Sequence, residues 1–185
     1  MESHNLSADD AKLLIVEKDK RYHKRHMALT GSNRGDRHNR DMLINSGQTV
    51  KMSRDSITDT VSSSLNGSLA YRYNGANSWN ADIFVSIHCN AANTKAYGCE
   101  TYYCTGSTQG RALAECVQPH MTAETERYNR GVKSANFAVI KHTNMPAILV
   151  ETAFIDNYDD NRFLASDDGK YKCAVGIYKG ICDYL

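Results

Sequence analysis

The sequence predicts a single α/β domain, with a mostly parallel, twisted sheet flanked by helices on both faces. Two short apolar runs, Ile83 to Ile87 and Ala147 to Val150, are typical of strands that are buried on both sides of a parallel sheet. Segments with helical spacing separate the strand-like runs along the chain, and this order produces parallel strands. At 185 residues the chain is long enough to bury most of its apolar surface as one domain.

The elements of the first half follow from local patterns. Gly47 to Arg54 has the composition of a turn that enters a strand, and a loop rich in Ser, Asn, Thr and Asp follows from Asp55 to about Asn66. Apolar and aromatic residues then recur at helical spacing from Leu69 to Trp79, which predicts a helix before the central strand.

The second half alternates strands and helices. Gly98 to Cys104 is rich in strong β-formers and predicts a strand. Arg111 to about Thr125 predicts an amphipathic helix that is interrupted near Pro119. The remaining expected elements are a turn at Asn129 to Gly131, a strand at Phe137 to Ile140, a helix that begins near Asp159, and a terminal helical face from Tyr171 to Leu185.

The amino-terminal part is different in composition. From Lys18 to Met42 the chain has eight Lys or Arg, three His and three Asp, and it shows no sustained helical stripe. This composition is typical of a solvated or poorly ordered surface segment, in which limited proteolysis would cut first. A patch that binds an anionic polymer or a nucleic acid is the alternative interpretation.

The composition argues against several other classes of protein. A net charge of +1 does not favour an obligate nucleic-acid binder, and no apolar segment approaches the roughly 20 residues of a membrane helix. The start, Met1 to His4, lacks the basic and apolar regions of a secretory signal, so we expect synthesis in the cytoplasm. The six cysteines contain no Cys-x-x-Cys pair, which favours free thiols over a zinc knuckle or disulfides.

The candidate site comes from the two apolar strands. His88 follows the first and Glu151 follows the second. Ligands of open α/β sheets bind beyond the carboxyl ends of the strands, so an imidazole and a carboxylate are expected to meet there. A capping His and a surface Glu are the alternatives, but two such groups at one edge favour a shared metal or acid/base site.

The surrounding residues resemble a known family. The segment Asn77 to Ala91, which contains Ser-Ile-His-Cys-Asn, is similar to the central motif of zinc-dependent N-acetylmuramoyl-L-alanine amidases of the amidase-3 type. Cys99 to Tyr103, Asn129 to Lys133 and Met145 to Asn157 resemble other motifs of that family in the same order. The resemblance covers roughly Leu43 to Leu185, and it implies an amidase catalytic domain over residues 1–185 with an atypical part at 1–42.

The resemblance implies a reaction and a set of residues. Such enzymes hydrolyse the amide between N-acetylmuramic acid and the L-alanine of the peptidoglycan stem peptide. Glu151 matches the catalytic glutamate, and His88 matches one of three Zn²⁺ ligands. Spacing in the family points to His4 and Glu17 for the other two, with Glu17 at the start of the first helix.

Three more residues are expected to bind substrate. Asn90 would bind substrate or orient the metal ligand, with a turn cap as the alternative. Arg130 and Lys133 would contact carboxylates of the stem peptide, with simple solvation as the alternative. The implied partner is bacterial cell-wall peptidoglycan, with no nucleic acid and no membrane, and we expect a monomer.

The amino terminus departs from the family pattern, because no apolar strand precedes His4 and the loop glycines are missing. The alternative metal ligands are His23, His26 or His38 for the first position and Asp36 or Asp41 for the second. Two other functions therefore stay open: a zinc peptidase on a related fold, and an inactive module that binds peptidoglycan.

Overall fold

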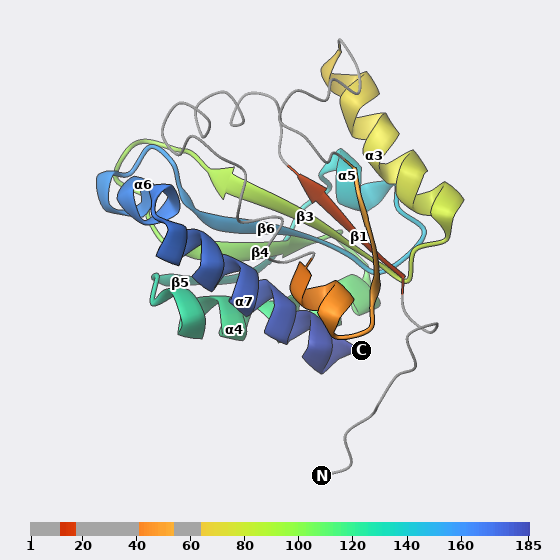
Figure 1. Ribbon diagram of the computed structural model, residues 1–185. Coiled ribbons are helices and arrows are strands. Elements are labelled where there is room, and N and C mark those ends of the chain that lie inside the picture. Colours follow the sequence, from red (N-terminus) through yellow and green to blue (C-terminus); the bar gives the residue numbers. More distant parts are fainter. Residues whose placement is uncertain (1–11, 18–40, 54–63) are drawn as a thin grey trace.

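The described residues form a six-stranded sheet with the order β2-β1-β3-β6-β4-β5. The computed structural model describes residues 12–17, 41–53 and 64–185. The strands are β1 (Lys12–Glu17), β2 (Thr49–Met52), β3 (Ile83–Asn90), β4 (Cys99–Tyr103), β5 (Asn129–Ser134) and β6 (Ala147–Phe154). The predicted α/β fold with a mostly parallel sheet is confirmed (Figure 1).

One pair of strands runs against the rest of the sheet. The pairs β1–β2, β1–β3, β3–β6 and β4–β5 are parallel, whereas β4 and β6 are antiparallel. The amino-terminal ends of β4 and β5 therefore lie at the same edge of the sheet as the carboxyl-terminal ends of β3 and β6.

Helices cover both faces of the sheet (Figure 1). On one face lie α3 (Leu65–Trp79) and α5 (Ala138–Lys141), and on the other lie α4 (Thr108–Thr125) and α7 (Asp167–Tyr184). The short helix α6 (Tyr158–Ala165) follows β6, and residues 41–45 are also helical. Side chains of Ser64, Ser107, Asn157 and Ser166 accept hydrogen bonds from the first backbone N–H groups of α3, α4, α6 and α7. These caps satisfy donors that a helix leaves without partners.

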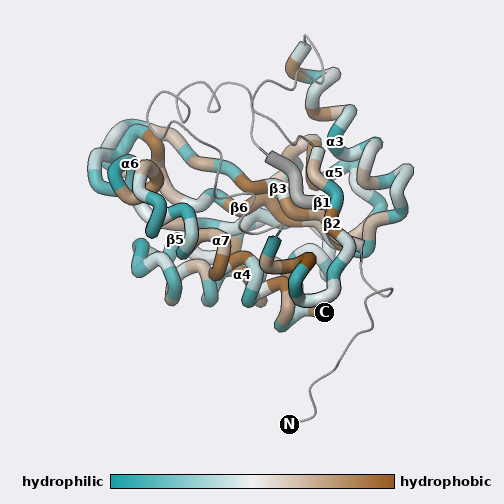
Figure 2. The backbone as a smooth tube through the Cα atoms, viewed as in Figure 1, coloured by the Kyte–Doolittle hydropathy of each residue, from teal (hydrophilic) through white to brown (hydrophobic). Residues whose placement is uncertain are grey.

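The core lies in two layers, one on each face of the sheet. Val85 and Val150 pack against Val117 of α4 and Ile177 of α7. On the opposite face the buried residues come from the sheet, α3 and α5, namely Phe84, Leu149, Ala76, Val139 and Ile140. Figure 2 shows hydrophobic residues along β3 and β6 between these layers. Because both strands are covered on both sides, their nearly continuous apolar sequences are explained.

Two sequence predictions about local structure are wrong. Phe137 to Ile140 is not a strand, because Phe137 is the N-cap of α5 and Val139 and Ile140 pack within the layer on that face. A short apolar run does not distinguish a strand from one buried helical turn. Asn129 to Gly131 is not a turn but the beginning of β5, in which Gly131 has a φ of +82°.

Helix α4 continues through Pro119 without the predicted interruption. Buried side chains hold the helix on both sides of the proline, with Leu113 and Val117 before it and Met121 after it. Packing therefore outweighs the hydrogen bond that proline cannot donate.

The remaining predictions about the chain agree with the structure where it is described. The strand near residue 50, the helix before the central strand and the last two helices are confirmed. All six cysteines are free thiols. Within residues 12–17, 41–53 and 64–185, none of the helices has the length and hydrophobicity needed to cross a bilayer. The basic segment Lys18 to Met42 lies outside the described residues except for its last two positions.

Candidate active site

His88 and Glu151 are direct neighbours in the sheet. They are paired in register between the parallel strands β3 and β6. Since residues of a strand alternate between faces, His88 shares the face of Phe84 and Glu151 shares the face of Leu149, which is the face of α3 and α5. His88 is 7% exposed and Glu151 is partly buried. The predicted meeting of an imidazole and a carboxylate is therefore confirmed.

The backbone and side chain of His88 are held by neighbouring hydroxyl groups. Nε2 of His88 lies 3.0 Å from Oγ of Ser86, and Oγ1 of Thr152 donates to the carbonyl oxygen of His88 at 2.9 Å. In the tautomer whose Nε2 carries the proton, Nε2 donates to Ser86. The lone pair then lies on Nδ1.

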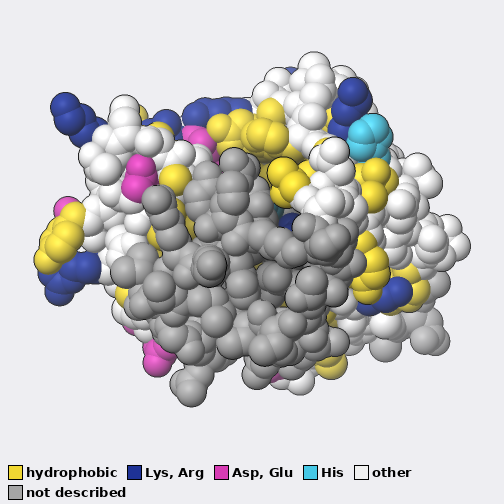
Figure 3. All heavy atoms as spheres, turned by 90° about the horizontal axis from the view of Figure 1, so that it is seen from above, with side chains coloured by type: hydrophobic (Ala, Val, Ile, Leu, Met, Phe, Trp, Pro, Cys, Tyr) yellow, Lys and Arg dark blue, Asp and Glu magenta, His cyan; other side chains and the backbone are white. Residues whose placement is uncertain are grey.

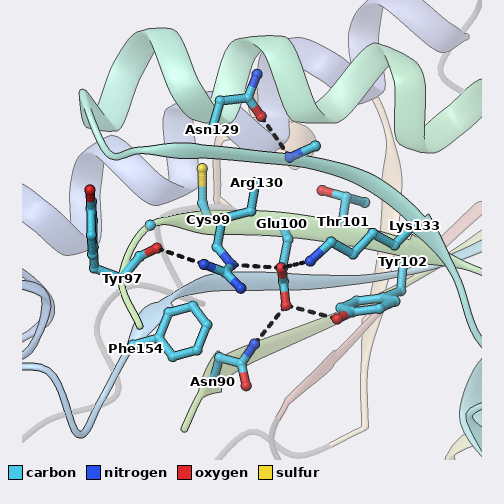
Figure 4. Close-up of polar contacts among 12 residues, drawn as sticks. Asn90, Tyr97, Cys99, Glu100, Thr101, Tyr102, Asn129, Arg130, Lys133 and Phe154 are labelled. Atoms are coloured by element: carbon cyan, nitrogen blue, oxygen red, sulfur yellow. Dashed lines mark hydrogen bonds and ion pairs between the residues drawn. The ribbon is translucent and has the colours of Figure 1, made fainter. Parts of the chain in front are cut away.

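A second carboxylate, Glu100, lies opposite Glu151 on the antiparallel strand β4. Its side chain is 3% exposed and is surrounded by donors. Oε1 accepts hydrogen bonds from Nδ2 of Asn90 and from the hydroxyl of Tyr102, each at 2.8 Å. Oε2 accepts from Nε of Arg130 at 2.8 Å and from Nζ of Lys133. We call these five residues the Glu100 cluster (Figure 4).

A bulge in β5 allows two cations of one strand to reach the same carboxylate. Arg130 and Lys133 are three residues apart, a spacing that puts side chains on opposite faces of a regular strand. The register between β4 and β5 shifts at this point, and Gly131 adopts a positive φ of +82°. Such a conformation favours glycine and is typical of one class of bulge. The extra residue brings Arg130 and Lys133 to one face.

Two hydrogen bonds to the side chain of Asn129 support the bulge. Oδ1 of Asn129 accepts from the backbone N–H of Gly131 at 2.9 Å and from Nε2 of Gln118 at 2.8 Å. Gln118 belongs to α4 and is 2% exposed. The conformation of β5 at Arg130 is thus fixed by the helix on the other face of the sheet.

Arg130 has two further contacts that orient its guanidinium group. The group lies 4.8 Å from the ring centroid of Phe154, a favourable cation–π distance, and Nη1 is 3.4 Å from the carbonyl oxygen of Tyr97. The side chain of Arg130 is still 28% exposed, and that of Lys133 is 38% exposed. Both cations therefore remain accessible to solvent on the face of Glu151.

Charges in the cluster perturb its pKa values. Burial alone would raise the pKa of Glu100, but hydrogen bonds from Lys133, Tyr102 and Arg130 outweigh it, so this pKa is lower than usual. The pKa of Tyr102 is raised, first by burial and then by its hydrogen bond to Glu100 and the charges of Glu100 and Glu151. At neutral pH the cluster thus contains one carboxylate and two cations, with a neutral phenol that donates.

Asn90, Arg130 and Lys133 were expected to bind substrate, and the structure brings all three together at Glu100. The amide of Asn90 donates to Glu100, and its Oδ1 accepts from the backbone N–H of Ala91 at 2.8 Å. The sequence analysis assigned no role to Glu100. The signal that could have found it is a single carboxylate inside a predicted strand, because a buried charge needs a partner.

Most of the predicted amino-terminal ligands lie outside the residues that the structure describes. His4, His23, His26, His38 and Asp36 lie outside the described residues. Asp41 is exposed in the helical residues 41–45. Glu17 was expected at the start of a helix, but it ends β1, because Leu13 to Val16 form an apolar run that pairs with β3. Glu17 is in register with Ile87, the residue before His88, and its role as a ligand stays a prediction.

The described residues do not complete a metal site. Among residues 12–17, 41–53 and 64–185, no three His, Cys, Asp or Glu side chains form a group that could hold a metal ion. His88 and Glu151 are two suitable groups. Any further ligands for a metal at this position would have to come from other parts of the chain.

Two protein families match the sequence. The N-acetylmuramoyl-L-alanine amidase family matches residues 36–183, and the cytidylate kinase-like family matches residues 1–48. His4, Glu17, His23 and His26 all precede the amidase match. The amidase match therefore gives no support to these four residues as ligands.

Curated relatives resemble this chain over part of their length. N-acetylmuramoyl-L-alanine amidase LytC of Bacillus subtilis is 44% identical over 120 residues, which are 63% of this chain and 24% of LytC. Amidase CwlM of Bacillus licheniformis is 37% identical over 143 residues, which are 77% of this chain and 54% of CwlM. The chain thus spans from about a quarter to about half of these relatives.

Solved structures share the fold over nearly the whole chain. The catalytic domain of amidase CwlV from Bacillus (Paenibacillus) polymyxa is 25% identical with a TM-score of 0.75, and 94% of this chain and 98% of that chain are covered. An N-acetylmuramoyl-L-alanine amidase from Clostridium difficile 630 is 25% identical with a TM-score of 0.79, and 95% and 97% are covered. From the family match over residues 36–183, we conclude that this chain belongs to the N-acetylmuramoyl-L-alanine amidase family.

Proposed function

We propose that this chain hydrolyses the amide bond between N-acetylmuramic acid and L-alanine in peptidoglycan. The observation that carries this proposal is the register pair His88–Glu151, which lies inside the stretch that matches the amidase family. The polymer substrate implies that the protein acts on the bacterial cell wall. Its partner is then peptidoglycan, and we propose that it acts as a monomer.

Glu151 is suited to the proton transfers of amide hydrolysis. An amide has a poor leaving group, so water must lose a proton as it adds to the carbonyl carbon, and the nitrogen must gain one as the C–N bond breaks. Glu151 would accept the proton of the water and return it to the nitrogen of L-alanine. Glu151 is partly buried, and its neighbours in the sheet are His88 on one side and Glu100 on the other.

Zinc is part of the proposal, as the resemblance implies. When bound, Zn²⁺ supplies a Lewis acid that polarises the carbonyl and lowers the pKa of bound water. Among the described residues His88 would be its ligand, and its buried imidazole with Nε2 next to Ser86 is consistent with this role. The described residues do not supply the remaining ligands.

The experiment uses the full chain with purified peptidoglycan and measures new amino-terminal L-alanine. Glu151→Gln should keep the fold and lower this release by a factor of at least about 100, because the general acid/base is lost. His88→Ala should lose both activity and metal, which elemental analysis of the purified protein would record at about one zinc per wild-type chain. Near wild-type release by Glu151→Gln would contradict the role of Glu151. New amino termini other than L-alanine would indicate a peptidase.

A second candidate function is peptidoglycan binding without hydrolysis. The observation in its favour is that the amidase match begins at residue 36, whereas residues 1–48 match another family. A wild-type chain that sediments with peptidoglycan, contains no zinc and releases no L-alanine would support this second function.

A further inference from the structure

The Glu100 cluster is built more rigidly than simple charge attraction to a substrate requires. A flexible lysine or arginine on the surface would be enough to attract an anion. Here Arg130 is instead fixed by Glu100 through Nε, by Tyr97 through Nη1 and by the ring of Phe154. In the part of the chain that the structure describes, Nη2 of Arg130 has no hydrogen-bond partner. The guanidinium group is thus oriented with one donor group available.

The position of this donor group fits a substrate whose amide is cut at Glu151. Glu100 and Glu151 are register partners, and such partners have Cβ atoms about 5 Å apart. An extended peptide advances about 3.5 Å per residue, so a carboxylate one or two residues beyond the cut bond lies about 4 to 7 Å from it. Figure 3 shows the molecule from the side of α3 and α5, where some Lys and Arg side chains lie next to hydrophobic ones.

We propose that Glu100 is a positioning residue that orients Arg130 to bind a carboxylate of the peptide part of the substrate through Nη2. This inference rests on the proposed function for the identity of the substrate. Glu100 itself does not contact substrate, because its side chain is 3% exposed and both of its oxygens are occupied by donors. It acts by holding Arg130 and Lys133 in place.

The charge of the cluster makes this proposal testable. Glu100→Gln removes one negative charge and leaves Arg130 and Lys133 unchanged. If the two cations bound a carboxylate only through their charge, the variant would bind it more tightly. If Glu100 is needed for orientation, the variant binds more weakly in spite of its greater positive charge.

The test measures equilibrium binding by calorimetry with two probes, and every chain tested carries Glu151→Gln so that the probes are not hydrolysed. One is N-acetylmuramoyl-L-alanyl-D-glutamate, and the other is the same compound with both glutamyl carboxylates converted to carboxamides. The chain with Glu151→Gln alone should prefer the first by about 10-fold or more, as expected for a hydrogen bond between charged groups. Glu100→Gln should lose most of this preference. Tighter binding of the carboxylate by this variant would overturn the proposal.

Two further variants complete the design. Arg130→Lys keeps the charge and leaves Glu100 in place but removes Nη2, so it should also lose the preference, even if Glu100→Gln does not fold. Glu115→Gln is the matched control, because Glu115 pairs with Arg111 on the exposed surface of α4 and should change neither affinity. A preference retained by Arg130→Lys would refute the role of Nη2.

The binding test of this inference and the hydrolysis test of the proposed function can fail independently of each other. Preference for the carboxylate probe in the Glu151→Gln background, with no release of L-alanine by the wild-type chain, would contradict hydrolysis and support the binding role of Arg130. Release of L-alanine by the wild-type chain, with equal or no binding of the two probes in the Glu151→Gln background, would overturn this inference and leave the amidase proposal standing.

Discussion

Glu100→Gln should lower the free energy of unfolding by about 1.5 to 3 kcal/mol. Gln has nearly the same volume, so the change leaves no cavity. It does remove the carboxylate oxygen on which Nε of Arg130 and Nζ of Lys133 converge. Each hydrogen bond with a charged partner contributes about 1.5 to 3 kcal/mol, which gives about 3 to 6 kcal/mol for the two.

The sum of about 3 to 6 kcal/mol overestimates the loss of stability, because solvation changes offset part of it. The cations are 28% and 38% exposed, so water can solvate them after the carboxylate is lost. The variant also avoids the desolvation of a carboxylate that is 3% exposed. A discount of about half leaves about 1.5 to 3 kcal/mol, which a domain with a typical stability of about 5 to 15 kcal/mol tolerates while remaining folded.

Urea unfolding followed by circular dichroism at neutral pH measures this difference. Glu115→Gln is the control, because its ion pair with Arg111 is more than half exposed on both sides and should contribute less than about 0.5 kcal/mol. The effect of Glu100→Gln should also change little between low and high salt, since buried charges are screened less than exposed ones. A loss below about 0.5 kcal/mol, or a gain in stability, would show that desolvation outweighs the ion pairs.

Two more predictions concern stability. The pKa of Glu100 is lowered from 4.5, so its contribution to stability is complete above pH 4.5 and is lost as the pH falls through the folded-state pKa. Urea unfolding from about pH 6 to about pH 3 should therefore show a smaller loss for Glu100→Gln than for the wild type, and equal losses would contradict this pKa shift. Gly180→Ala should cost about 1 to 3 kcal/mol, because a Cβ there would lie 2.4 Å from Cα of Val117 between α7 and α4. The matched control Gly75→Ala has no atom within 4 Å of the new Cβ and should gain up to about 1 kcal/mol. A Gly180→Ala variant as stable as the wild type would show that the two helices can move apart.

The strands that carry His88 and Glu151 could be predicted because a strand that is buried on both faces has a nearly continuous apolar sequence. Ile83 to Ile87 and Ala147 to Val150 are apolar on both faces since α3 and α5 cover one side and α4 and α7 the other. Strand β5 has no such apolar sequence. It is an edge strand of partly exposed residues, and its glycine and asparagine are typical of turns. Local composition therefore identified Asn129 to Gly131 as a turn, whereas pairing with β4 makes it a strand with a bulge.

Glu100 could not be assigned a role because its partners are visible only after the chain folds. Arg130 and Lys133 stand 30 and 33 positions later in sequence. Their spacing of three residues would separate them in a regular strand, and the positive φ of Gly131 that joins them depends on Asn129 and Gln118. Neither the conformation nor the contact follows from composition or periodicity, so the sequence alone predicts two solvated cations.

The reversal of β4 is the feature that places Glu100 beside Glu151. In a wholly parallel sheet the second residue of β4 would lie at the edge opposite to His88. A parallel connection requires a crossover of a dozen or more residues, usually with a helix, whereas loop 91–98 between β3 and β4 contains no helix. The length of this loop therefore already favoured an antiparallel β4. With that orientation, Glu100 near the start of β4 and Glu151 near the end of β6 are brought to the same edge, and the cations of β5 follow because β5 is parallel to β4.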